Sequence, residues 1–124
     1  LLDNLLSNAC KYTMPQGEIS LDLKATKRKA ILSLKDNGIG ISEEDLPHIF
    51  DRFWRAEKSR HQKGLGLGLS LAETIVSLHG GTIRAGSELG RGTEFEIILP
   101  VRQYTVKWTD RPLHRYESRY ITTA

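Results

Sequence analysis

The chain has 124 residues, of which 39% are hydrophobic, enough for one domain with one core and too few for two. No apolar run has the length of a transmembrane span or a signal peptide, so the sequence predicts a soluble domain. The net charge of +3 arises from residues 101–124, while residues 1–100 carry 13 basic and 13 acidic residues, which argues against a nucleic-acid-binding surface on the folded part.

Residues 1–12 have helical periodicity, and the chain begins inside this helix without a preceding cap. Its apolar side includes Cys10, the lone cysteine, which we expect to be a small buried residue. An Asn carbonyl is a hard oxygen that suits Mg²⁺, an ion that completes its shell with water and phosphates. Taken alone, the polar side fits a solvated helix face better than a metal site. It spans about 100° and carries Asn4, Asn8, Lys11 and Tyr12.

Alternating apolar residues then predict two strands, from Ile19 to Leu23 and from Ala30 to Lys35, joined by a charged hairpin tip. The second strand leads directly into Asp36, which is followed by the glycine-containing turn 37–40. An aspartate at a strand end, followed by a sharp turn, projects a carboxylate into a cavity at that edge of the sheet. A turn-capping aspartate is the alternative role.

Residues 42–63 form the polar middle of the chain. Ser42 and the acids after it predict the start of a short helix that includes Leu46 and Ile49. Three aromatic residues follow that can anchor this segment against the core: Phe50, Phe53 and Trp54. Residues 56–63 have no pattern and are rich in basic residues, which predicts a mobile loop. Such a loop can close over a triphosphate or be merely solvated.

A glycine-rich run extends from Lys63 to Leu71. Glycine at every second position permits positive φ and brings backbone N–H groups close to an anion. A helical pattern follows and ends at Gly80-Gly81. The run therefore predicts a phosphate-binding loop at the start of a buried helix, with an ordinary glycine-rich turn as the alternative. The apolar positions expected to face the core are Leu71, Ala72, Ile75, Val76 and Leu78.

Two more strands are predicted, from Thr82 to Ser87 and from Thr93 to Leu99. Together these elements predict an α+β fold, a two-layer α/β sandwich with helices on one face of a mixed sheet. Residues 101–124 form a C-terminal tail, in which alternating apolar residues fit either a strand at a sheet edge or an unstructured tail.

Four segments resemble, in order and spacing, the sequence boxes of sensor histidine kinases. Residues 4–12 resemble the N box, 36–40 the G1 box, 50–53 the F box and 64–69 the G2 box. The resemblance covers residues 1–100, with the first strand and the start of the first helix missing, and leaves 101–124 unassigned. It implies the Bergerat ATP-binding fold, shared with type II topoisomerases, heat-shock 90 chaperones and mismatch-repair ATPases.

The resemblance also implies roles for individual residues. Asp36 would accept the adenine amino group, Asn8 would bind Mg²⁺, and Arg55 would stabilise charge on the γ-phosphate during transfer. Gly38 and Gly40 would let the backbone pass close to the base. The other implied residues are the supporting Asn4, the phosphate and nucleotide contacts Lys11, Tyr12, Phe50 and Thr93, the phosphate cradle Gly64, Leu65, Gly66, Leu67, Gly68 and Leu69, and the lid 51–63.

The activity implied is transfer of the ATP γ-phosphoryl group to a histidine on a separate dimerisation and phosphoacceptor domain. In the hydrolytic relatives a glutamate one turn before the Mg²⁺ asparagine is the base for water, whereas this chain has Asn4, which cannot take a proton. The phosphoacceptor is expected elsewhere in the parent protein, because no histidine here has the family's phosphoacceptor context: His48, His61, His79 and His114.

Two other functions stay open, a non-catalytic ATP-binding regulatory module and an anti-sigma serine kinase of the same fold. The cofactors implied are ATP and Mg²⁺. The partners implied are the phosphoacceptor domain and a response regulator, with no nucleic acid, and the parent protein is expected to be a homodimer. Most members of the family are membrane-anchored sensors with this domain in the cytoplasm, and the same arrangement is expected here.

Overall fold

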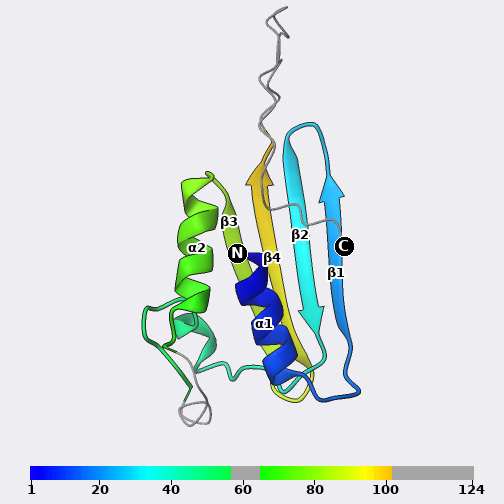
Figure 1. Cartoon of the computed structure of the whole chain (residues 1–124), viewed down its shortest axis with the longest axis vertical. Helices are drawn as coiled ribbons and strands as arrows, with labels where there is room; N and C mark the ends of the chain where they lie inside the picture. Colours follow the sequence, from blue (N-terminus) through cyan, green and yellow to red (C-terminus); the bar gives the residue numbers. More distant parts are fainter. Residues whose placement is uncertain (57–64, 102–124) are drawn as a thin grey trace, which may run out of the picture.

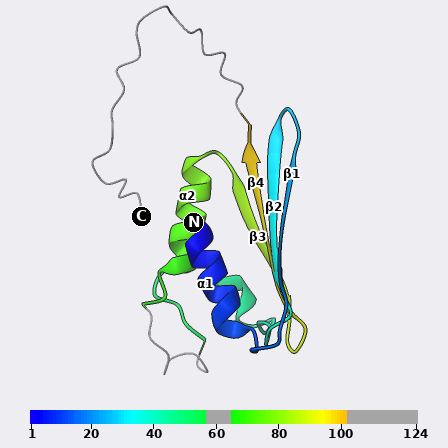
Figure 2. The same cartoon turned by 45° about the vertical axis from the view of Figure 1, so that its right-hand side comes forward.

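The computed structural model describes residues 1–56 and 65–101. Figure 1 shows helices α1 and α2 on the same face of one sheet, and Figure 2 shows the two layers in a turned view. The predicted two-layer α+β sandwich is confirmed. In chain order the elements are α1 (Leu2–Tyr12), β1 (Ile19–Ala25), β2 (Lys29–Asp36), the 3₁₀ helix η1 (Leu46–His48), α2 (Gly68–Leu78), β3 (Thr82–Glu88) and β4 (Gly92–Pro100).

The four strands lie in the order β1-β2-β4-β3. The sequence predicts a mixed sheet, but all three pairings between the described strands are antiparallel, because both hairpins fold back on themselves and β4 runs opposite to β2. In this register Leu34 on β2 lies between Leu21 on β1 and Phe95 on β4. The same pairing sets Asp36, the last residue of β2, opposite Thr93 near the start of β4.

The core lies between the helices and the middle of the sheet. Each helix buries two apolar residues that are four positions apart, as expected for a helix packed along one stripe: Leu5 and Ala9 on α1, Ala72 and Val76 on α2. The other buried apolar residues are Leu34, Ile49, Phe95 and Ile97. All seven residues of β1 are exposed, because β1 lies at the edge of the sheet, beyond the area that the helices cover (Figure 2).

Three expectations about burial are wrong. Cys10 is exposed, because it lies about 100° around the helix from the buried Ala9. Leu71 and Leu78 on α2 are 51% and 80% exposed. The helix packs instead through the smaller Ala72 and Val76, which turns these leucines away from the sheet.

The end of α2 and the position of the short helix agree with the sequence predictions. Gly80 has a φ of +72° and its N–H donates to the carbonyl of Ser77, while Gly81 donates to the carbonyl of Val76, a Schellman motif that ends α2. The predicted short helix is a three-residue 3₁₀ turn, preceded by a hydrogen bond from Asp45 N–H to Ser42 Oγ. In the part of the chain that the structure describes, no helix has the length and hydrophobicity needed to cross a bilayer.

Candidate functional site

Asp36 ends β2 and is 6% exposed. Its Oδ1 accepts hydrogen bonds from the N–H groups of Gly38, at 2.9 Å, and Thr93, at 3.3 Å. The first bond is the turn-capping interaction that the sequence left open as an alternative, and the second fixes the carboxylate to β4. Oδ2 makes no hydrogen bond to any residue in 1–56 or 65–101, so the oriented carboxylate retains an oxygen for an external donor.

The turn after Asp36 is held between α1 and the β3–β4 hairpin. Ile39 N–H donates to the carbonyl of Tyr12 at 3.1 Å. A Cβ on Gly38 would lie 2.3 Å from that same Tyr12 carbonyl oxygen, and a Cβ on Gly40 would lie 2.1 Å from the carbonyl oxygen of Glu88. Both glycines are therefore required by contacts within the protein itself, before any ligand is considered.

Helix α1 contacts both ends of the predicted site. At its start, Asn4 Nδ2 donates to the carbonyl of Gly68, the first residue of α2, at 3.1 Å. At its end, the Tyr12 carbonyl holds the turn. Asn8 lies between them on the helix and is half-buried, while the exposed Lys11 places its Nζ 5.2 Å from the centroid of the Tyr12 ring. Hydrogen bonds at Asn4 and at the Tyr12 carbonyl thus fix both ends of the polar row on α1.

The predicted phosphate cradle is described from Leu65 onward, and Gly64 lies outside the described residues, as do lid residues 57–63. Gly66 has a φ of +69°, and its carbonyl accepts from Phe53 N–H at 3.0 Å. Leu67 precedes α2 without a side-chain cap, and the N–H groups of the first turn have no partner among the described residues. Unpaired N–H groups at a helix start are suited to bind a phosphate. Leu69 packs against the core, whereas Leu65 is 74% exposed.

The aromatic segment before the cradle is partly packed as expected. Phe50 meets Phe95 edge to face, with ring centroids 6.4 Å apart, so the structure shows Phe50 in a packing role. Trp54 stacks on His48, whereas Phe53 is 70% exposed. Arg55 follows and is half-buried. It lies beside the cradle, because a Cβ on Gly66 would come within 3.1 Å of its Cγ.

A metal ion at this site would need ligand atoms from a bound nucleotide as well as from the protein. No group of three or more His, Cys, Asp and Glu residues in the described segments could hold a metal ion. Asn8 offers one carbonyl oxygen, which fits Mg²⁺ because that ion accepts few protein ligands and fills its shell with water and phosphate oxygens.

Ser87 is a residue that the sequence reasoning missed. Its Oγ accepts from Ile41 N–H at 2.7 Å and lies 2.9 Å from Thr93 Oγ1. One signal in the sequence could have identified it. Ser87 follows Ile83 and Ala85 at an inward position of the strand, where an apolar residue is expected.

Two hollows lie away from these residues. One, of about 410 Å³, lies between the end of α2 and β3 and is lined by residues such as Ser77, Leu78 and Thr82. The other, of about 350 Å³, lies near Arg28 and Pro100. No predicted site residue lines either of them, so hydrogen bonds rather than cavity volume define the candidate site.

Residues 1–103 match the family model described as "Histidine kinase-, DNA gyrase B-, and HSP90-like ATPase". The sensor protein SrrB of Staphylococcus aureus is 44% identical over 102 residues, which are 81% of this chain and 18% of SrrB. The chain therefore spans less than a fifth of the length of this relative.

Several solved structures are similar. The mycobacterial sensor histidine kinase MprB has a TM-score of 0.70 at 33% identity, over 78% of this chain and 67% of that chain. Full-length ShkA in complex with AMPPNP has a TM-score of 0.69 at 31% identity, over 80% of this chain and 20% of ShkA. The nucleotide-free catalytic domain of the histidine kinase ThkA has a TM-score of 0.68 at 31% identity, over 80% and 63%.

Proposed function

Because the chain belongs to the histidine kinase-, DNA gyrase B- and HSP90-like ATPase family, and is an ATP-binding domain of the histidine kinase type, we propose that it transfers the γ-phosphoryl group of ATP to a histidine on a separate helical domain. The observation that carries the choice of transfer over hydrolysis is Asn4. Its amide donates to the Gly68 carbonyl, and an amide cannot accept a proton from water. Asn4 therefore positions α2 and does not activate water.

Binding of the adenine base rests on Asp36. Its Oδ1 is held by Gly38 and Thr93, which leaves Oδ2 to accept the adenine amino group in a charge-assisted hydrogen bond. Support for a nucleotide at a fold of this kind comes from ShkA, whose structure contains AMPPNP.

The phosphates bind at the start of α2, where backbone N–H groups and the helix dipole favour an anion. In this proposal the cradle is the predicted run from Gly64 to Leu69, which the structure describes from Leu65 onward, and Lys11 and Tyr12 contact the nucleotide from α1. Asn8 would hold Mg²⁺ together with phosphate oxygens and water. When bound, the ion neutralises phosphate charge during transfer.

Arg55 stabilises the charge on the transferred group. In the reaction, the bond from the γ-phosphorus to the β,γ-bridging oxygen breaks, a phosphorus–nitrogen bond to the acceptor histidine forms, and ADP leaves. Positioning and electrostatic stabilisation supply most of the catalysis in such transfers. This role is supported by the place of Arg55 beside Gly66 in the cradle, where a Cβ on Gly66 would come within 3.1 Å of the Arg55 Cγ.

The proposed partners are the phosphoacceptor domain of the same parent protein, in a homodimer, and a response regulator that receives the phosphoryl group. Residues 1–100 form the catalytic domain in this proposal, and residues 101–124 are a tail without an assigned role. We propose that the domain lies in the cytoplasm and is part of a membrane-anchored sensor protein.

The adenine site is tested by calorimetric titration of the chain with ATP and Mg²⁺. Asp36→Asn removes the charge at nearly constant volume and should weaken ATP binding at least about tenfold. Asp22→Asn, on the exposed face of β1, is the matched control and should bind as the unchanged chain does. Equal affinity in Asp36→Asn and the unchanged chain, both folded by circular dichroism, would overturn the assignment.

Transfer is tested by supplying the helical phosphoacceptor domain and following labelled phosphate from ATP. Arg55→Ala should lower the transfer rate about a hundredfold or more while leaving ATP affinity within a few-fold. Arg84→Ala, an exposed arginine on β3, is the control. ATP binding without any transfer by the unchanged chain would favour the regulatory module instead.

A further inference from the structure

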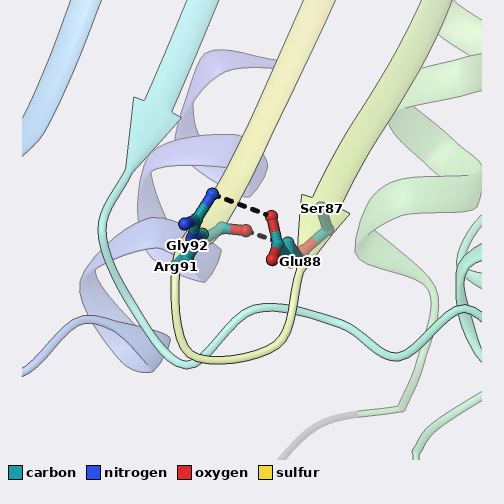
Figure 3. A network of polar contacts seen from close by, with 4 residues as sticks. All are labelled: Ser87, Glu88, Arg91 and Gly92. Carbon is teal, nitrogen blue, oxygen red and sulfur yellow. Dashed lines mark hydrogen bonds and ion pairs between the residues drawn. The ribbon is translucent and has the colours of Figure 1, made fainter.

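Phe53 has a backbone conformation that its side chain disfavours. Among residues 1–56 and 65–101, every residue with a positive φ is a glycine except Phe53, whose φ is +62°. The β3–β4 hairpin follows the general rule, because its positive φ values fall on Gly90 and Gly92, the latter labelled in Figure 3 at the start of β4. In this conformation the Cβ crowds the following carbonyl oxygen, which costs free energy that other contacts must offset.

The ring of Phe53 does little to offset this cost. It is 70% exposed, whereas the neighbouring aromatic residues pack their rings, Phe50 against Phe95 and Trp54 against His48. An exposed ring gains little free energy from burial. A residue with an unfavourable backbone and an exposed side chain keeps its conformation only where the surrounding contacts impose it, and such residues cluster at functional sites.

Contacts on both sides of Phe53 impose its conformation. On the N-terminal side, its N–H donates to the carbonyl of Gly66 at 3.0 Å. On the C-terminal side, the ring of Trp54 stacks on His48, with centroids 6.4 Å apart, and the Trp54 N–H donates to the carbonyl of Asp51 at 3.4 Å. The φ of Phe53 is the rotation that separates these two sets of contacts, so its positive value lets the chain keep both.

The same rotation places the chain that leads to Arg55. A Cβ on Gly66 would lie 2.7 Å from the Trp54 carbonyl oxygen, 2.9 Å from the Phe53 carbonyl carbon and 3.1 Å from Arg55 Cγ. Residues 53–55 therefore pass directly against the α-carbon of Gly66 in the predicted cradle. A negative φ at Phe53 would leave its N–H on Gly66 but would swing Trp54 and Arg55 away about the N–Cα bond.

We propose that Phe53 is a positioning residue for phosphoryl transfer, and that its left-handed backbone, not its ring, holds Arg55 against the cradle. The inference rests on the proposed role of Arg55 at the γ-phosphate. Because this reaction depends on positioning, a displacement of about 1 Å can lower its rate roughly a hundredfold. The proposed contacts of Asp36 and α1 with the nucleotide do not involve Phe53, so ATP binding should change little.

The experiment measures transfer of labelled phosphate to the helical phosphoacceptor domain at a series of ATP concentrations, which gives kcat and KM separately. Phe53→Asn removes the ring but tolerates a positive φ, so kcat should stay within about twofold. Phe53→Val also removes the ring, but a β-branched residue strongly disfavours a positive φ. Its kcat should fall at least about tenfold, with KM for ATP within about threefold.

Gly80→Ala is the control for a general loss of stability. Gly80 has a φ of +72° at the far end of α2, where a Cβ would lie 3.6 Å from Pro100 Cγ, an ordinary contact. This variant should lower the midpoint of thermal unfolding without changing kcat. Where Phe53→Val does not fold, Phe53→Thr replaces it, because threonine is also β-branched and its hydroxyl suits an exposed position. The same fall in kcat is then expected.

Two results would overturn the inference. A kcat for Phe53→Asn as low as that for Phe53→Val would show that transfer needs the ring, for example as a contact with the helical domain. An unchanged kcat in the β-branched variant would show that the backbone conformation has no role in transfer. Arg55→Ala in the same series separates the two proposals. Full transfer by Arg55→Ala would contradict the role of Arg55 itself, whereas its loss beside an unaffected Phe53→Val would overturn this inference alone.

Discussion

Two glycines with nearly the same backbone conformation differ in their surroundings. Gly40 has a φ of +72° and Gly90 a φ of +79°, both in the left-handed region that disfavours a side chain. A Cβ on Gly40 would lie 2.1 Å from the carbonyl oxygen of Glu88, whereas a Cβ on Gly90 would meet nothing within 4 Å. Gly40 is therefore needed for close packing as well as for its backbone conformation.

The first prediction compares alanine at these two positions. Gly90→Ala should lower the free energy of unfolding by about 1 kcal/mol, the cost of the left-handed conformation. Gly40→Ala should cost about 2 kcal/mol more, because the turn must also move away from Glu88, and it should weaken ATP binding by displacing the turn beside Asp36. Urea denaturation and ATP titration measure both effects. Equal losses in the two variants would contradict the packing argument.

Helix α1 is the element that joins the two halves of the site. Its carbonyl at Tyr12 holds the turn, and its side chain at Asn4 holds the start of α2. Because α2 begins at Gly68 without a side-chain cap of its own, its position depends on contacts with its neighbours. Asn4 thus has a structural role that its place in the N box does not reveal.

The second prediction concerns this link. Asn4→Asp replaces an amide donor by a carboxylate that faces the Gly68 carbonyl, so the free energy of unfolding should fall by about 1–2 kcal/mol. Ser7→Asp adds the same charge on the exposed side of α1 and should change stability by less than about 0.5 kcal/mol. Thermal unfolding followed by circular dichroism compares them. A stable Asn4→Asp variant would show that the link contributes little.

Across the whole molecule, coverage by the helices decides which strands are buried. Leu34 and Leu21 are direct partners on the same face of the sheet, yet Leu34 is 2% exposed and Leu21 is 48% exposed. Figure 2 shows that the two helices leave β1 uncovered at the edge. Alternation along a strand therefore identifies its apolar side without showing whether anything packs on it.

The third prediction tests this difference. Leu34→Ala should cost about 3 kcal/mol of unfolding free energy, because it leaves a cavity in the core. Leu21→Ala should cost less than about 1 kcal/mol, since its side chain is already half in water. Chemical denaturation of both variants gives the comparison. A loss in Leu21→Ala as large as that in Leu34→Ala would mean that β1 is covered in solution.

The sequence by itself determined the features that depend on neighbours along the chain. Helical and strand periodicity located the elements, Gly80-Gly81 ended α2 through local hydrogen bonds, and the four boxes with their spacing identified the family. These features are predictable because each is fixed within one or two turns of helix, one strand or one turn.

The tertiary structure alone decided the features that join distant parts of the chain. Strand β4 lies between β2 and β3, which brings Thr93 N–H to Asp36 across 57 positions and Ser87 to Ile41 across 46. It also decided that Cys10 faces solvent, although the sequence placed it on an apolar helix face. Periodicity shows which side of an element is apolar, but strand order and helix placement decide which groups meet, because those contacts form between segments far apart in the sequence.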